Sequence, residues 1–163
     1  MNESDTVVII PGSDTNMYSS KKAPLEKRNI SPGFKHEVVR FAETLVGIPY
    51  KFASTDPSEG FDCSGFITYV FNHFNVAVPR SSVDFTNMGE QIDQMNAKEG
   101  DLILFTGTND SIKIVGHMGI ITENTDTLKF IHSTSGRANG VTISNFSEHY
   151  KKRFVKIIRI FPD

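Results

Sequence analysis

One short stretch of the chain combines the residue types that nucleophilic catalysis needs. Cys63 is the only cysteine among 163 residues, and it follows a turn-rich segment, 55–60. Asp62 is a favoured N-cap residue, so Cys63 falls in the first turn of a helix, where the helix end favours a thiolate. A thiolate attacks carbonyl carbon, so the stretch predicts a nucleophile, whereas a lone cysteine is more often a small buried apolar residue.

A cysteine nucleophile needs a base, and two histidines offer one. His117 lies between two glycines in the apolar run 115–122, and His132 lies near the end of the run 128–133. The short turn between these runs predicts a hairpin, which brings both rings to the same edge of a sheet. We therefore expect His117 to act as the base and His132 to orient it. His132 must be neutral to accept a hydrogen bond from the far ring N–H of His117, so activity should fall as the pH is lowered.

The remaining histidines and glycines predict no further site. His36, His73 and His149 fall on helix surfaces or in a polar segment and are expected to be solvated. No paired cysteine or histidine spacing indicates zinc, and Gly116 and Gly119 lie inside a strand rather than before a phosphate-binding helix. We expect no metal and no organic cofactor.

The elements that must position these residues divide into helices first and strands later. Residues 1–30 predict a tail or linker, and Ser31 with Pro32 predicts the cap and first turn of a helix whose apolar stripe reaches Leu45. The helix that starts at Cys63 should end near Asn75, and a short helical segment should follow at 79–88.

Five apolar runs after residue 98 predict strands joined by short turns, with a short helix at 145–152 capped by Ser144 or Asn145. The runs are 102–105, 115–122, 128–133, 140–144 and 154–161. This order predicts a single α+β domain over 31–163, with helices packed on one side of a mostly antiparallel five-stranded sheet.

Composition excludes several classes of partner. The formal net charge of −2 with mixed signs argues against nucleic acid or an anionic membrane as the partner. No apolar run is long enough for a membrane span, and Val7 to Ile10 is too short for the core of an export signal. A single cysteine allows no internal disulfide. We expect a monomer.

Five motifs in order resemble a known family. They are Asp62-Cys63-Ser64-Gly65, Pro79-Arg80-Ser81-Ser82, Gly100-Asp101-Leu102, Gly116-His117-Met118-Gly119-Ile120 and Phe130-Ile131-His132-Ser133. Together they resemble the NlpC-type family of bacterial cell-wall cysteine peptidases, a circularly rearranged relative of the papain fold. The resemblance covers about residues 33–163 and implies the nucleophile at Cys63, the base at His117 and the third polar residue at His132.

The resemblance also implies a substrate and a place of action. It implies hydrolysis of peptidoglycan stem peptides or muropeptides, commonly at the bond from γ-D-glutamate to a diamino acid. Tyr50 matches a tyrosine whose hydroxyl bonds the substrate or the oxyanion. The expected location is the cell envelope, periplasmic or secreted. The sequence as given carries no export signal, and such signals are removed from mature proteins.

Residues around the nucleophile carry two readings. Asp62 either caps the helix or, with Ser64 and Arg80, faces the substrate, where a carboxylate would hold the free amine of a stem peptide. Where the family often has a glycine pair, this chain has Ala53 and Ser54, whose side chains should limit the approach of substrate.

Two other functions remain open at this point. A thiol-dependent amidase or acyltransferase would use the same thioester with a different acceptor. A wall-binding domain with a silent site would keep the fold without the chemistry.

Overall fold

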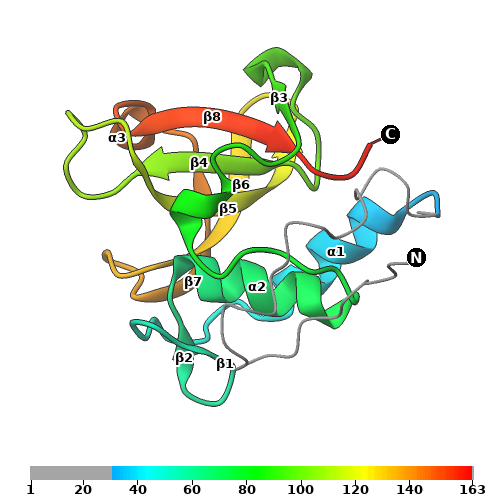
Figure 1. The fold of residues 1–163 in the computed structure, drawn as a ribbon, viewed down its shortest axis with the longest axis vertical. Coiled ribbons are helices and arrows are strands. Elements are labelled where there is room, and N and C mark those ends of the chain that lie inside the picture. Colours follow the sequence, from blue (N-terminus) through cyan, green and yellow to red (C-terminus); the bar gives the residue numbers. More distant parts are fainter. Residues whose placement is uncertain (1–30, 163) are drawn as a thin grey trace, which may run out of the picture.

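This computed structural model describes residues 31–162. They form a six-stranded sheet with two long helices on one face (Figure 1). The predicted tail, 1–30, lies outside the described residues. The strand order is β3-β8-β4-β5-β6-β7, and all neighbours are antiparallel. The strands are β3 (Glu90–Ile92), β4 (Leu102–Thr106), β5 (Val115–Asn124), β6 (Leu128–Thr134), β7 (Gly140–Asn145) and β8 (Phe154–Arg159).

The five predicted strands are confirmed as β4 to β8, but the predicted strand count is wrong. A sixth strand, β3, pairs with β8 at the edge of the sheet. It has three residues and none is buried, so no apolar run marked it. A two-stranded ribbon, β1 (Thr55–Asp56) with β2 (Gly60–Phe61), also forms in the segment predicted as loop.

Helix α2 (Cys63–His73) starts where the sequence predicts, and the Asp62 side chain caps it by accepting the N–H of Gly65. Helix α1 (Phe34–Glu43) starts later than predicted, and the Ser31 cap is wrong. Gly33 precedes α1 with a φ of 91°, a left-handed conformation that glycine adopts without strain, and the chain enters the helix from that turn. No described helix is long and apolar enough to cross a bilayer.

The later helical segments are shorter than predicted. The stretch 79–88 contains one 3₁₀ turn, η4 (Ser82–Phe85), and a second, η5 (Gln94–Asn96), follows β3. Helix α3 (Glu148–Lys151) follows Ser147, so the predicted caps Ser144 and Asn145 are wrong. Both of these residues belong to β7.

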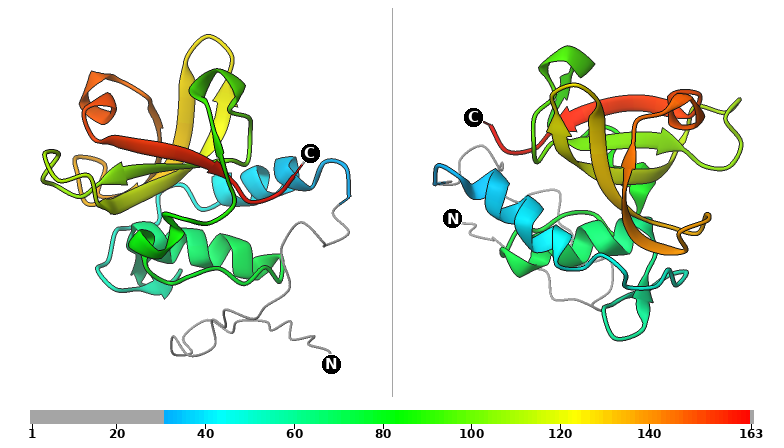
Figure 2. Two further views of the ribbon diagram at one scale, coloured as in Figure 1. Left: turned by 45° about the horizontal axis from the view of Figure 1, so that its top comes forward. Right: turned by 180° about the vertical axis from the view of Figure 1, so that it is seen from behind.

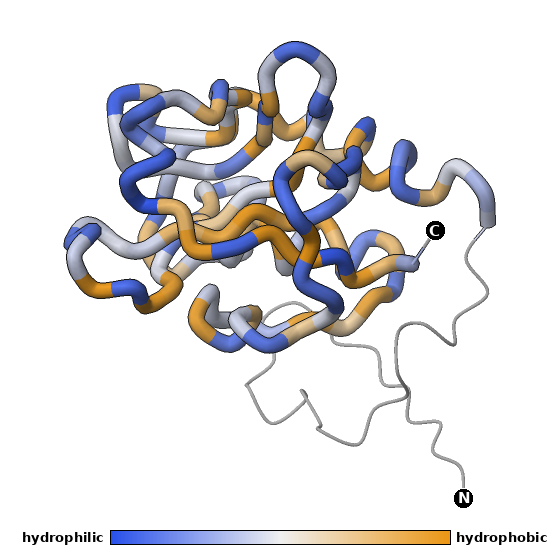
Figure 3. The backbone as a smooth tube through the Cα atoms, turned by 90° about the horizontal axis from the view of Figure 1, so that it is seen from above, coloured by the Kyte–Doolittle hydropathy of each residue, from blue (hydrophilic) through white to orange (hydrophobic). Residues whose placement is uncertain are grey.

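The sheet is covered on both faces, which explains why every residue of β4 is buried. Leu102 and Leu104 join the cluster that contains α1 and α2, whereas Ile103 and Phe105 join a second cluster with Phe146 and Tyr150. Helices α1 and α2 therefore lie on one side of the sheet, as predicted (Figure 2). Tyr150, from the one-turn α3, belongs to the cluster on the other side. Hydrophobic segments gather between these layers, and hydrophilic ones mark the connecting loops (Figure 3).

Candidate active site

The loop before α2 and the start of the helix are joined through one carboxylate. Asp62 Oδ1 accepts the Gly65 N–H at 2.6 Å, and Oδ2 accepts the Ala53 N–H at 2.9 Å. Gly65 permits the close approach, because a Cβ there would lie 2.1 Å from the carbonyl oxygen of Ser54. Ala53 takes a left-handed φ of 62°, at the place where the family often has glycine. These contacts hold Cys63, the predicted nucleophile, at the first position of α2.

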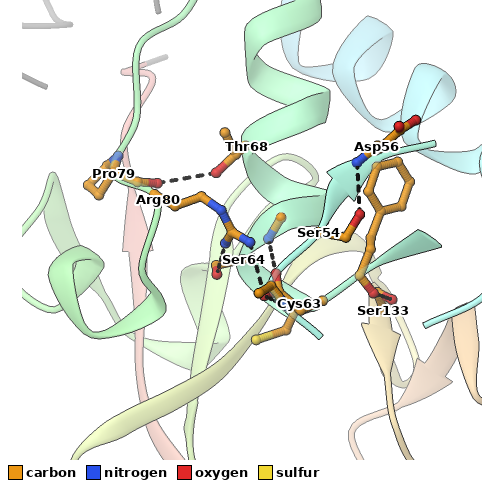
Figure 4. A network of polar contacts seen from close by, with 12 residues as sticks. Ser54, Asp56, Cys63, Ser64, Thr68, Pro79, Arg80 and Ser133 are labelled. Carbon is orange, nitrogen blue, oxygen red and sulfur yellow. Dashed lines mark hydrogen bonds and ion pairs between the residues drawn. The ribbon is translucent and has the colours of Figure 1, made fainter. Parts of the chain in front are cut away.

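Arg80 lies against the same helix end (Figure 4). Its Nη1 donates to Ser64 Oγ at 2.8 Å and its Nη2 donates to Asp62 Oδ2 at 3.0 Å. Asp62, Ser64 and Arg80, the predicted substrate-facing set, therefore contact one another. The capping reading of Asp62 is confirmed, and a contact of this set with substrate stays a prediction.

The Ser54 side chain turns into its own loop. Its Oγ accepts the N–H of Asp56 at 3.1 Å, and the residue is buried. The expectation that this side chain limits the approach of substrate is therefore wrong, because the hydroxyl is used in the turn that leads to β1. Ala53 is exposed.

The Cys63 thiol is in its protonated form at neutral pH. Burial and the neighbouring Asp62 carboxylate raise the pKa of Cys63 to about 11, and they outweigh the hydrogen bonds from the amides of Ser64 and Met118. The expected thiolate is thus wrong for the resting site, because desolvation exceeds the effect of the helix end. Sγ lies 3.7 Å from the carbonyl oxygen of Gly116, the residue before His117.

His117 and His132 meet as predicted, and a third residue continues the chain of contacts. His117 Nε2 lies 2.7 Å from His132 Nδ1, and His132 Nε2 lies 2.9 Å from Ser144 Oγ. If His117 Nδ1 is to accept a proton, its Nε2–H must donate to His132, whose Nε2–H then donates to Ser144. No hydrogen bond joins Sγ to the His117 ring among the described residues, so the thiol must turn from Gly116 to engage the base.

Burial keeps both rings neutral. His132 is fully enclosed and His117 nearly so. Desolvation, the partner ring and the Arg153 charge hold the pKa of His117 well below its usual range. Desolvation and Arg153 lower the pKa of His132 to about 3. The neutral imidazole is the form that accepts a proton, so the pair is poised as a base over a wide pH range.

Aromatic rings and one glycine hold the His132 ring in place. Phe130 and Tyr150 lie 4.6 and 5.6 Å from it, measured between ring centroids. A Cβ at Gly119 would lie 3.2 Å from the Cβ of His132 and 2.9 Å from the oxygen of Ile131, so only glycine allows β5 to approach this closely.

A cavity of about 940 Å³ opens beside the nucleophile and is lined by Cys63, His117 and Tyr50 among others. Burial and the charges of Cys63 and Asp62 raise the pKa of Tyr50, so its hydroxyl stays protonated and can donate. Asp62, Ser64 and Arg80 lie outside this lining. Within residues 31–162, no group of three potential metal ligands occurs.

Sequence reasoning missed several residues of the cavity. Ser144 is one strand beyond His132, in a register that pairs His132 with Thr142, so the two lie diagonally on one face. Knowledge of that register was the missing signal. Arg137 and Arg153 also line the cavity, as does His149, which is exposed as expected. His36 and His73 are exposed as predicted and lie outside the cavity lining, with His36 bonded to Glu99.

Comparison with known sequences and structures identifies the family of this chain. The profile of the NlpC/P60 family matches residues 47–159, which hold all three predicted catalytic residues. The chain belongs to the NlpC/P60 family. The crystal structure of an NlpC/P60 protein from Bacillus cereus superposes with a TM-score of 0.70 at 27% identity, over 82% of this chain and 42% of that one. The P60 domain of an M. avium antigen gives 0.64 at 27% identity, over 79% and 96%. The predicted papain-like α+β class is therefore confirmed.

Two curated NlpC/P60 relatives carry names for activities. One is the gamma-DL-glutamyl hydrolase of Bacillus subtilis, 38% identical over 127 residues, which are 77% of this chain and 29% of the relative. Another is the murein DD-endopeptidase and LD-carboxypeptidase MepS of Escherichia coli, 28% identical over 91% of this chain and 75% of the relative. The chain thus spans under a third of the first relative and three quarters of the second.

Proposed function

We propose that this chain is a cysteine endopeptidase that hydrolyses stem peptides of peptidoglycan, at the bond from γ-D-glutamate to a diamino acid. The observation that carries the proposal is the line of hydrogen bonds from Ser144 through the buried His132 to His117, at 2.9 and 2.7 Å. His117 and Ser144 line the same cavity as the only cysteine. The relatives' names, a γ-glutamyl hydrolase and a murein endopeptidase, support the class of substrate.

The resting protonation states define the first step. His117 takes the proton of the Cys63 thiol on Nδ1 as Sγ forms a bond to the amide carbon. The raised pKa of Cys63 and the lowered pKa of His117 mean that this transfer occurs with the attack rather than before it.

In the later steps His117 protonates first the leaving amine and then the departing Cys63 sulfur. The His117 imidazolium gives its proton to the leaving amine as the carbon–nitrogen bond breaks, which leaves a thioester on Cys63. A water then gives a proton to His117 and attacks the thioester, and Cys63 leaves with a proton restored. His132 holds the His117 ring in the tautomer that each of these steps needs.

Two donors are placed to stabilise the oxyanion. The backbone N–H of Cys63 belongs to the first turn of α2, whose amides have no partner within the helix. The protonated Tyr50 hydroxyl lines the same cavity. Tyr50 therefore serves as an oxyanion or substrate donor in this proposal.

The test is a digest of defined muropeptides followed by mass spectrometry. We expect two products from each γ-D-glutamyl–diamino acid bond, with the mass of one water added. A product in which an added amine replaces water would instead identify an acyltransferase. Absence of cleavage, with peptide binding retained, would identify a silent wall-binding domain.

The grip on a free amine is a separate proposal within this function. Asp62 Oδ2 already accepts from Arg80, so a substrate amine would have to share the carboxylate with the guanidinium. The measurement is kcat/KM for L-Ala-γ-D-Glu-diamino acid and for its N-acetylated form, repeated in Asp62→Asn. A preference for the free amine that disappears in Asp62→Asn supports the grip, and equal rates in the wild-type protein leave Asp62 as a cap alone.

The place of action follows from the proposed substrate, and the state of assembly from the candidate catalytic residues. Peptidoglycan lies outside the cytoplasmic membrane, so we propose a periplasmic or secreted enzyme. We further propose that it acts as a monomer, since every predicted catalytic residue comes from one chain.

A further inference from the structure

The described side chains that line the cavity beside Cys63 include basic residues and no acidic ones. Arg137 and Arg153 contribute permanent positive charges, and His149 adds an ionisable ring. They come from three places: Arg137 from the β6–β7 loop, Arg153 from the residue before β8, and His149 from α3. Among the described residues that line the cavity, none is an aspartate or a glutamate. A chain with a net charge of −2 therefore presents a cationic wall at its candidate active site.

Arg153 is held beside the histidines by the backbone of β4. Its Nη2 donates to the Thr106 oxygen at 3.0 Å, and its own carbonyl accepts the Thr106 N–H at 2.7 Å. After desolvation, its charge also contributes to the lowered pKa of His117 and of His132.

Arg153 differs from the other part-buried arginines in having no acidic partner. Arg80 pairs with Asp62 and Arg159 pairs with Asp101, at 3.0 and 2.8 Å. Within residues 31–162, no carboxylate lies within ion-pair distance of Arg153, and its buried Nε has no hydrogen-bond partner. The guanidinium charge therefore has no carboxylate from the described chain, and Arg153 lines the cavity, where an anion can pair with it.

Arg137 supplies a second charge that packing does not require. It lies in the loop after β6, is exposed, and lines the cavity with Thr134 and Ser135. No ion pair engages it among the described residues. Two guanidinium groups with free donors and nearby hydroxyls form a surface that suits an anion with planar oxygens, since guanidinium binds carboxylate with two parallel hydrogen bonds.

We propose that Arg153, assisted by Arg137, binds a carboxylate of the substrate next to the scissile bond. The inference rests on the proposed function and deepens it: the site selects γ-glutamyl peptides whose carboxylate is free over those in which it is amidated. Two carboxylates of the proposed substrate have this chemistry, the α-carboxylate of the D-glutamyl residue and the carboxylate of the diamino acid.

The test compares three peptides that differ by one amide. They are L-Ala-γ-D-Glu-diamino acid, its form with the glutamyl α-carboxylate amidated, and its form with the diamino acid amidated. We expect at least one amidated form to lose about tenfold or more in kcat/KM, because amidation removes the negative charge with which the guanidinium pairs. Which form loses identifies the carboxylate that Arg153 holds.

Substitutions then assign the effect to the arginines. In Arg153→Gln the acid-to-amide ratio should fall close to one, while Arg153→Lys, which keeps the charge, should retain part of it. Arg137→Gln should lower the ratio without a change in melting temperature, since its side chain is exposed. Lys151→Gln is the matched control, because it also removes one positive charge. Lys151 lies in α3 and outside the cavity lining, so the acid-to-amide ratio should stay as in the wild-type protein.

Binding separates this inference from the proposed function. In Cys63→Ala, calorimetry should show tighter binding of the free acid than of the amide, and Arg153→Gln in that background should abolish the difference. Equal affinities for acid and amide, or a ratio that survives in both Arg153→Gln and Arg137→Gln, overturn the carboxylate subsite. Failure of the wild-type protein to cleave any of the three peptides overturns the proposed function, whatever the binding result.

Discussion

Both nitrogens of His132 are engaged, so this residue can act only through its neighbours. Its Nδ1 lies 2.7 Å from His117 Nε2 and its Nε2 lies 2.9 Å from Ser144 Oγ, while the ring is fully buried. His132→Gln keeps an acceptor for His117 and should retain more activity than His132→Ala, as kcat/KM will measure. His117→Ala removes the base and should lower kcat/KM at least about a hundredfold below that of the wild-type protein. Equal activity of the two His132 variants would refute the orienting role.

Ser144 is the hydrogen-bond partner of His132 Nε2. Its Oγ can accept from Nε2–H, which leaves Nδ1 free to accept from His117. We expect Ser144→Ala to lower kcat more than KM rises, and Ser144→Thr to recover most of the loss by restoring the hydroxyl. The comparison of kcat and KM in the three proteins tests this role, and a Ser144→Ala enzyme with unchanged kcat would contradict it.

The protonation states of the histidines predict the pH dependence of the reaction. The working forms of His117 and His132 are neutral, and burial holds the pKa of both below the ordinary value, with His132 at about 3. Lowering the pH through 6.5 should therefore leave kcat/KM nearly unchanged, and the loss should come only at lower pH. A profile of kcat/KM from pH 4 to 8 checks this, and an acid limb centred at 6.5 would show that the rings are not desolvated as described.

At the scale of elements, the start of α2 depends on a single side chain. Asp62 accepts from Gly65, Ala53 and Arg80, and so it joins the helix, the preceding loop and the segment before η4. Each contact fixes the position of Cys63 without touching the cavity. Stability and catalysis are therefore coupled at this helix end.

Removal of that carboxylate should destabilise the fold. Asp62→Ala loses the cap and leaves Arg80 without its ion pair, so we expect a loss of roughly 2 kcal/mol or more in the free energy of unfolding. Asp62→Asn, which can still accept from Gly65, should lose less. Asp84→Ala, at an exposed aspartate, should stay within about 0.5 kcal/mol. Denaturant unfolding measures all three, and an Asp62→Ala protein as stable as the Asp84→Ala control would contradict the account.

Elements with strong local signals were predictable, and those that depend on distant partners were not. The Asp62 cap and the five apolar runs are local patterns, and they mark α2 and β4 to β8 correctly. Strand β3 has only exposed or half-buried residues and exists because β8 offers it an edge. The start of α1 was placed too early, because Ser31 with Pro32 matches a capping pattern that the left-handed Gly33 replaces.

At the scale of the whole molecule, the candidate site lies where the start of α2 meets strands β5 and β6 of the sheet. Cys63 comes from α2, while His117 and His132 come from adjacent strands (Figure 1). The hairpin of β5 and β6 was predictable, since a short turn separates the two runs. Ser144, from β7, and Arg153, just before β8, also belong to the site. The strand order that brings them there cannot be predicted from local residue spacing.

The nucleophilic role of Cys63 is the central claim, and it has a direct measurement. Since this is the only cysteine, no other thiol can replace it. The experiment follows the cleavage of L-Ala-γ-D-Glu-diamino acid by mass spectrometry with the wild-type protein and with Cys63→Ala. The account predicts products from the wild-type protein alone, with Cys63→Ala folded and at the level of the buffer blank. Hydrolysis by purified Cys63→Ala above that blank would contradict it.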